Sequence, residues 1–143
     1  MQKALVCSVC GYVHLKETAP EKCPVCGVNS KMFNLKDDAL KTNEDIVITG
    51  ESHKKHLPEI TVNDIAENIQ EIKAKIGELE HPMIPEHYIT NIMFYADNEY
   101  VGGIALTHNL KPEGSVSINA KGKKISVIEH CNIHGDWITE IQK

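Results

Sequence analysis

The sequence predicts a mainly β protein in which a small metal-binding unit precedes an antiparallel β-sandwich. Two Cys-x-x-Cys pairs lie within the first 27 residues, which indicates a compact metal knuckle. From residue 46 onward, short segments rich in β-branched and aromatic residues alternate with turn residues, as in sandwich folds. The chain of 143 residues is 41% hydrophobic, so a core of ordinary size can form.

The metal-binding unit is expected over residues 1–36. Each cysteine pair is followed by a glycine, Gly11 or Gly27, which tolerates the positive φ that a tight knuckle turn needs. A segment this short requires a bound metal to fold, and a tetrahedral four-thiolate site accepts iron or zinc. A pair of disulfides is the alternative. The predicted ligands are Cys7, Cys10, Cys23 and Cys26.

A polar stretch separates the two units. Residues 35–45 contain few large apolar side chains, which predicts a linker over 37–47 with one helical turn around Asp38–Lys41. The sandwich then occupies residues 48–143. Its expected strands are Tyr88–Tyr95, Tyr100–Leu106, Ser115–Asn119, Lys124–Cys131 and Trp137–Ile141. The turns between them are expected at Asp97-Asn98, Pro112-Glu113-Gly114 and Lys121-Gly122-Lys123.

One segment of the second unit supports two interpretations. Isoleucines and a leucine recur at helical spacing between Ile65 and Leu79, which favours an amphipathic helix. Apolar residues also alternate from Ile72 to Ile76, and Gly77 would weaken a helix. A strand over 69–76 is the preferred interpretation, supported also by the family resemblance given below, and a helix is the alternative.

Composition narrows the classes of function. The formal net charge of −5 argues against general nucleic-acid binding. No apolar run approaches the length of a membrane span, and the N-terminus lacks the apolar core of a signal peptide. We therefore expect a cytoplasmic protein, in which paired cysteines favour metal over disulfides.

A second metal centre is expected around Cys131 and His134, which are three residues apart and followed by Gly135. His56, His81 and His87 each lie in a prolyl turn context and are candidate partners. Four imidazoles and one thiolate suit a redox-active transition metal better than a structural zinc. The remaining histidines receive no role: His14, His53, His108 and His130.

Three motifs, in order, resemble the superoxide reductase family of neelaredoxin and desulfoferrodoxin. They are Lys-His-x-Pro at 55–58, His-Pro-Met-x-Pro-Glu-His-Tyr-Ile at 81–89 and Cys-Asn-x-His-Gly-x-Trp at 131–137. The resemblance covers roughly residues 48–143 and implies an immunoglobulin-like seven-stranded sandwich. It also implies a non-haem iron with one open position, at which superoxide gains one electron and leaves as hydrogen peroxide. The implied ligands are four equatorial histidines, His56, His81, His87 and His134, and an axial cysteinate, Cys131.

The first unit resembles rubredoxin in the short-loop form found at the end of rubrerythrins. The matching residues are Cys-x-x-Cys-Gly-Tyr at 7–12 and the stretch 19–27 around the second pair. The resemblance implies one iron that relays electrons to the second iron, with a structural zinc as the alternative. Desulfoferrodoxins carry adjacent cysteines in their second pair, so this module differs from theirs.

Two lysines precede the first histidine ligand. Lys55 matches the family's lysine beside the open position, where its charge would attract superoxide and organise a proton-donating water. Lys54 stands where most family members carry a glutamate that binds the oxidised iron. We therefore expect water or hydroxide on the ferric iron, unless Glu51 reaches it. Together with His53, the lysines would make the mouth of the site positive.

Other functions fit the motifs less well. A zinc hydrolase would need an open site with fewer ligands, and no His-Glu-x-x-His motif is present. A cupredoxin-like electron carrier needs a methionine downstream of His134, and none follows it. A structural or metal-storage role is the remaining alternative. The family resemblance implies an external electron donor, such as rubredoxin or a reductase, and a homodimer or homotetramer.

Overall fold

The computed structural model describes residues 1–45 and 55–142 and is mainly β, which confirms the predicted fold class. The elements are β1 (Gln2–Cys7), β2 (Val13–His14), a 3-10 helix η1 (Ser30–Met32), β3 (Phe33–Lys41), β4 (Pro58–Ala66), β5 (Ile69–Ile76), β6 (Ile89–Ala96), β7 (Glu99–Ala105), β8 (Glu113–Ile118), β9 (Lys124–Cys131) and β10 (Gly135–Gln142). Within those residues, no helix has the length and apolar character that crossing a membrane requires.

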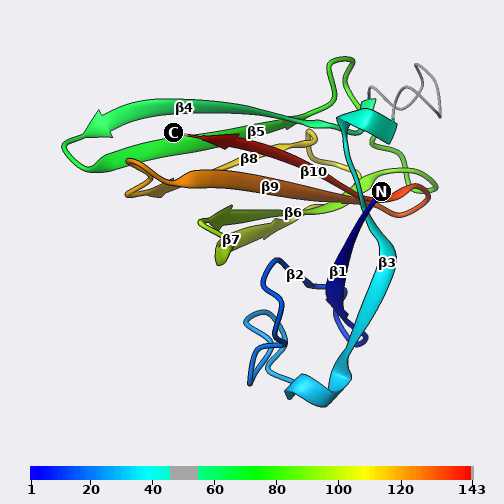
Figure 1. Ribbon diagram of the computed structural model, residues 1–143. Helices are drawn as coiled ribbons and strands as arrows, with labels where there is room; N and C mark the ends of the chain where they lie inside the picture. The colour runs from blue at the N-terminus through cyan, green and yellow to red at the C-terminus, as the bar shows by residue number, and fades with distance from the viewer. Residues whose placement is uncertain (46–54, 143) are drawn as a thin grey trace.

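Strands β4 to β10 form the sandwich seen in the upper half of Figure 1. One layer contains the order β10-β9-β6-β7, and the other contains β4-β5-β8. Four strands facing three is the arrangement of a constant-type immunoglobulin sandwich. Apolar side chains from both layers, including Ile72, Ile76, Phe94 and Val127, fill the space between them. The predicted sandwich is thus confirmed.

The ambiguous segment is a strand, and its bounds match the preferred interpretation. Ile72, Ala74 and Ile76 are buried on one face of β5, and the lysines between them are exposed. Three residues of the helical pattern are exposed instead, Ile65, Ile69 and Leu79. Period-two burial outweighs the coincidental helical spacing because only one face of β5 meets the core.

Strand β3 replaces the helical turn that was expected around Asp38–Lys41. It pairs antiparallel with β1, and its last residues pair parallel with β10, Leu40 opposite Asp136 and Lys41 opposite Trp137. The helical prediction was wrong because Leu40 is fully buried in the core, where an extended backbone also completes the sheet. The division at 1–36, 37–47 and 48–143 stays a prediction, and β3 runs across its first boundary.

An aromatic cluster packs the N-terminal unit against β6 and β7. The ring of Tyr12 lies 6.4 Å from that of Tyr95 and 5.3 Å from that of Tyr100. The buried Tyr95 hydroxyl donates a hydrogen bond of 2.5 Å to the carbonyl of Val13. Lys16 and Glu99 form an ion pair at the surface. The unit below the sandwich in Figure 1 is therefore held by side chains as well as by β3.

Two of the three turns predicted from the sequence are present in the structure. Asp97 and Asn98 have positive φ between β6 and β7, and Gly122 turns the chain between β8 and β9. The expected turn at Pro112-Glu113-Gly114 was wrong, because Glu113 and Gly114 already belong to β8. A Cβ at Gly114 would meet the end of the Ile104 side chain on β7, which would have to move.

Gly77, directly after β5, provides a test of how the loop before β4 is placed. Its φ is +89°, and a Cβ would collide with the carbonyl oxygens of Lys55 and Leu79. We expect Gly77→Ala to lower the free energy of unfolding by about 2–4 kcal/mol, through backbone strain and overpacking. Chemical denaturation measures this. Gly122→Ala is the control, because its φ of +73° faces open space and should cost about 1 kcal/mol. Equal losses of unfolding free energy in the two variants would contradict the close approach of the two carbonyl oxygens to Gly77.

Candidate metal centres

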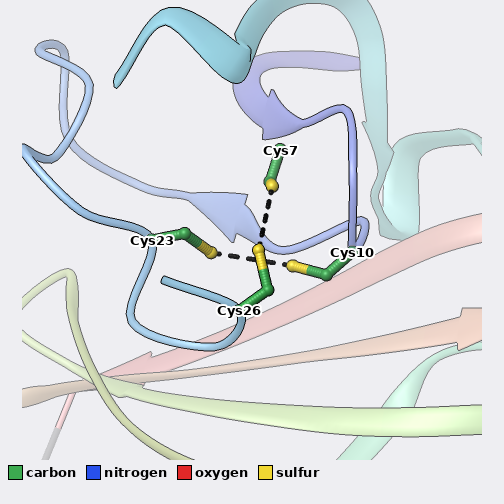
Figure 2. A group of neighbouring side chains, drawn as sticks. All are labelled: Cys7, Cys10, Cys23 and Cys26. Carbon is green, nitrogen blue, oxygen red and sulfur yellow. Dashed lines mark hydrogen bonds between the residues drawn. The ribbon is translucent and has the colours of Figure 1, made fainter. Parts of the chain in front are cut away.

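The four N-terminal cysteines converge on one point, as Figure 2 shows. The sulfur atoms of Cys7 and Cys26 are 3.7 Å apart, and those of Cys10 and Cys23 are 3.6 Å apart. A tetrahedral ion with metal–sulfur bonds of about 2.3 Å needs sulfurs about 3.8 Å apart, whereas a disulfide needs about 2.05 Å. The geometry therefore fits a four-thiolate metal site.

The knuckle turns depend on backbone amides. Gly11 and Gly27 have φ of 83° and 82°, which confirms the role predicted for both glycines. The amide of Gly11 donates to the carbonyl of Cys7, and the amide of Tyr12 donates to the sulfur of Cys10 at 3.4 Å. Burial opposes ionisation of Cys7, yet hydrogen bonds from the Cys10 and Val9 amides lower its pKa to about 7. A thiolate is thus accessible near neutral pH.

One edge of the four-cysteine site faces solvent. Cys7 and Cys23 are buried, but Cys26 is exposed. The apolar knuckle residues Val9 and Val25 are exposed beside it. A redox partner could therefore approach within contact of a sulfur ligand from this edge.

The second centre lies at one end of the sandwich. His56 precedes β4, His81 and His87 lie between β5 and β6, and Cys131 ends β9. One ligand atom from each of these four residues lies within 4.8 Å of all the others. His134 is beside them: its Nδ1 is 3.7 Å from the Cys131 sulfur, and its ring is 4.7 Å from that of His56. All five predicted residues therefore meet, and their role as ligands stays a prediction.

Two ring nitrogens are poised to bind a metal. The Nδ1 of His81 hydrogen-bonds to the carbonyl of Pro82 at 2.8 Å. In the described part of the chain, the buried Nε2 atoms of His81 and His87 have no hydrogen-bond partner. Burial, opposed by the Pro82 hydrogen bond and reinforced by His87, lowers the pKa of His81 to about 4. The imidazole is neutral at pH 7, as metal binding requires.

A buried layer lies behind the first histidine. The ring of His56 stacks on that of Trp137 at 5.1 Å, with 10° between the planes. The carboxyl group of Glu129 is fully buried, 3.6 Å from the Nδ1 of His56. Burial, followed by the charges of Cys131 and Asp136, raises the pKa of Glu129 well above its usual range. The stacked indole and this carboxyl group therefore lie against the His56 ring.

Asn132 joins two of the ligand-bearing segments. Its side-chain amide donates to the carbonyl of Glu86 at 3.1 Å and accepts from the amide of Tyr88 at 3.0 Å. Its own backbone amide donates to the carbonyl of Tyr88 at 3.2 Å. The loop of Cys131 is thus tied to the segment that carries His87. The sequence motif contained Asn132, but nothing in the motif indicated which segment it would contact.

The charged residues predicted beside the site are only partly described. Lys55 is half-buried, and its charge contributes to lowering the pKa of His81, so it lies near the centre. Glu51, His53 and Lys54 lie outside the described residues. His130 forms a pair with Asp136 at 3.0 Å instead of joining the centre.

Comparisons with known proteins agree with both resemblances found in the sequence. Residues 48–140 match the family model described as desulfoferrodoxin, and residues 6–34 match the rubredoxin-like domain of rubrerythrin. A desulfoferrodoxin from Desulfarculus baarsii is 33% identical over 129 residues, which cover 83% of this chain and 93% of that protein. A superoxide reductase from Pyrococcus abyssi is 31% identical over 101 residues, covering 62% of this chain and 87% of that protein.

The fold also has solved counterparts. The structure of a superoxide reductase from Nanoarchaeum equitans is similar with a TM-score of 0.58 and 25% sequence identity. The match covers 65% of this chain and 96% of that chain. The chain therefore has two metal-binding sites, one with four cysteines and one with histidines and a cysteine, that fit the centres of these relatives.

The Asn132 contacts generate a prediction. We expect Asn132→Ala to lower the affinity of the histidine–cysteine centre for Co²⁺ about tenfold, because the two side-chain hydrogen bonds between the ligand loops are lost. The free energy of unfolding should fall by only about 1 kcal/mol, since Asn132 is exposed. Absorption titration with Co²⁺ measures the affinity. Asn119→Ala removes a comparable exposed contact, to the amide of Lys121, and should leave the affinity unchanged. Equal affinities in the two variants would contradict the role of Asn132.

Proposed function

Because this chain belongs to the desulfoferrodoxin family, we propose that it reduces superoxide to hydrogen peroxide by one electron. The observation that carries the proposal is the convergence of His56, His81, His87 and Cys131 within 4.8 Å on a β-sandwich. Relatives described as superoxide reductases support it, including those of Pyrococcus abyssi and Nanoarchaeum equitans. The reaction consumes one superoxide, one electron and two protons for each peroxide.

We propose iron as the metal of both centres, with zinc as the alternative in the four-cysteine site. In the second centre His56, His81, His87, His134 and Cys131 would hold the metal. Iron held by these residues would supply the one electron that the substrate gains. The protein's part is to shelter the thiolate, since Cys131 is fully buried, and to hold the histidine rings by hydrogen bonds and stacking.

Lys55 is the residue that we propose to act on the substrate. The chain carries a net charge of −5, which repels an anion at long range. Lys55 directly precedes His56, and its charge acts on His81. A cation at the mouth would raise the local concentration of superoxide and orient water that supplies protons to the departing peroxide.

The four-cysteine site is proposed to relay electrons to the second centre. Strand β3 leads from Phe33, paired with Cys7, to Lys41, paired with Trp137. This path is eight residue steps, or about 26 Å along the strand. An external donor, such as rubredoxin or a reductase, would deliver electrons at the exposed edge beside Cys26.

Three wider proposals accompany this function. The free thiols support a cytoplasmic setting, which cell fractionation would test. Self-association as a dimer or tetramer follows from the family resemblance, and light scattering would test it. Units at 1–36 and 48–143 are proposed to fold around separate metals, and separate metal-release transitions on adding chelator would support this division.

The function is tested by counting products. The protein, loaded with iron and reduced at both sites, is mixed anaerobically with excess superoxide, with peroxide and dioxygen followed. We expect two peroxides per chain and no dioxygen above the protein-free control, because each chain stores two electrons. Cys26→Ser, which disables the relay site, should yield one peroxide per chain.

Other stoichiometries separate the parts of the proposal. One peroxide per chain in both proteins would refute the relay but support the reductase. One peroxide for every two superoxides, with dioxygen released, would mean dismutation. Absence of turnover would favour a metal-storage or electron-carrier role. If formation of the second peroxide per chain does not depend on protein concentration, the electron relay lies within one chain.

Lys55→Ala should slow the second-order reaction with superoxide about tenfold at low salt and flatten its dependence on ionic strength. Stopped-flow or pulse radiolysis measures the rate. Lys121→Ala is the control. It removes the same charge from the turn between β8 and β9, at the opposite end of β9 from Cys131, and should change the rate with superoxide little. A wild-type rate in Lys55→Ala would remove the residue from the mechanism.

A further inference from the structure

We propose that Lys41 is a positioning residue of the histidine–cysteine centre, so that the strand leaving the four-cysteine unit builds part of the second metal site. Its ammonium group contacts the carbonyl of one proposed ligand, His134, and the indole of Trp137, on which a second proposed ligand, His56, is stacked. The inference deepens the proposed function by adding a residue to the same site. It depends on a metal binding there, and it does not depend on superoxide being the substrate.

The placement of Lys41 is fixed by the sheet. Lys41 is the last residue of β3, and its neighbour Leu40 is fully buried in the core. The parallel pairing sets Lys41 opposite Trp137 on β10. Because the backbone is held by the sheet and by Leu40, the side chain starts from a defined position beside the turn of residues 132–134.

The ammonium group binds that turn directly. Lys41 Nζ donates to the carbonyl oxygen of His134 at 2.5 Å. Gly135, the next residue, has φ of +78°, and a Cβ there would lie 3.6 Å from the same Nζ. The ammonium therefore covers a turn that has no side chain of its own at this point. A hydrogen bond from a charged donor is stronger than one between neutral groups, so it restrains the backbone of His134.

A second contact reaches the other ligand through an aromatic ring. Lys41 Nζ lies 5.5 Å from the centroid of Trp137, within the range of a cation–π interaction. Trp137 also contacts His56, whose ring stacks on it at 5.1 Å. One cation thus hydrogen-bonds the carbonyl of His134 and contacts the indole on which the His56 ring is stacked.

The charge of Lys41 also matters to the centre. The thiol of Cys131 and the carboxyl of Glu129 are both buried close by. Lys41 opposes the increase in the pKa of Glu129 that burial and nearby acidic groups cause. A fixed positive charge disfavours the more positive, oxidised state of a bound metal, and hence raises its reduction potential.

The test compares three substitutions in the full chain, with the four-cysteine site already loaded. Lys41→Met keeps the stem and removes both the donor and the charge. It is expected to lower the affinity of the second centre for Co²⁺ about tenfold and to lower the midpoint potential of the iron-loaded centre. Lys41→Arg should restore both values. Lys36→Met, an exposed position on the same strand, is the control and should resemble the wild type.

Each outcome decides the proposal. A Co²⁺ affinity of Lys41→Met within twofold of that of Lys36→Met, together with an unchanged midpoint potential, would overturn it, even if stability falls. If Lys41→Met does not fold, Lys41→Gln keeps a donor and removes the charge, and an unchanged potential in that variant would also overturn it. A third outcome is that the wild-type protein fails to reduce superoxide while Lys41→Met still loses Co²⁺ affinity. That combination would support the role of Lys41 and refute only the proposed function.

Discussion

The parallel pairing of β3 with β10 is the contact on which the arrangement of the two centres depends. It joins the strand that leaves the cysteine knuckles to the strand that follows Cys131. Because Leu40 is buried at this junction, the pairing is held by packing as well as by the backbone ladder. The tyrosine contacts at β6 and β7 hold the same unit at a second place. Two metal sites that are distant along the chain therefore belong to one continuous sheet.

The two centres differ in how much protein surrounds them. The knuckle site binds through short turns, and Cys26 remains exposed, which suits electron exchange with another molecule. The second centre draws its residues from separate loops, and His56, His81 and Cys131 are all buried. Such a site needs loops held in place by contacts outside the ligands, which Asn132 and the stacked Trp137 provide.

The sequence predicted local features well where local chemistry decides them. The Cys-x-x-Cys-Gly turns, the alternation in β5 and the bounds of β9 all follow from neighbouring residues and from period-two burial. The helical turn near Asp38–Lys41 was wrong because this polar segment is a strand that pairs with β1 and, at its end, with β10, more than 90 residues later. The turn expected at Pro112-Glu113-Gly114 was wrong because Glu113 and Gly114 pair with Lys75 and Ala74 of β5.

By itself, the sequence determined which side chains are the candidates for metal binding: two cysteine pairs, four histidines in three motifs and one further cysteine. Thiol and imidazole groups have metal affinities that depend on residue type, so they can be recognised without coordinates. Only the tertiary structure decided which other residues contact these side chains. Glu129, Lys41 and Trp137 reach His56 and His134 through contacts between strands and loops. These contacts depend on register and packing between distant segments, and no local pattern specifies them.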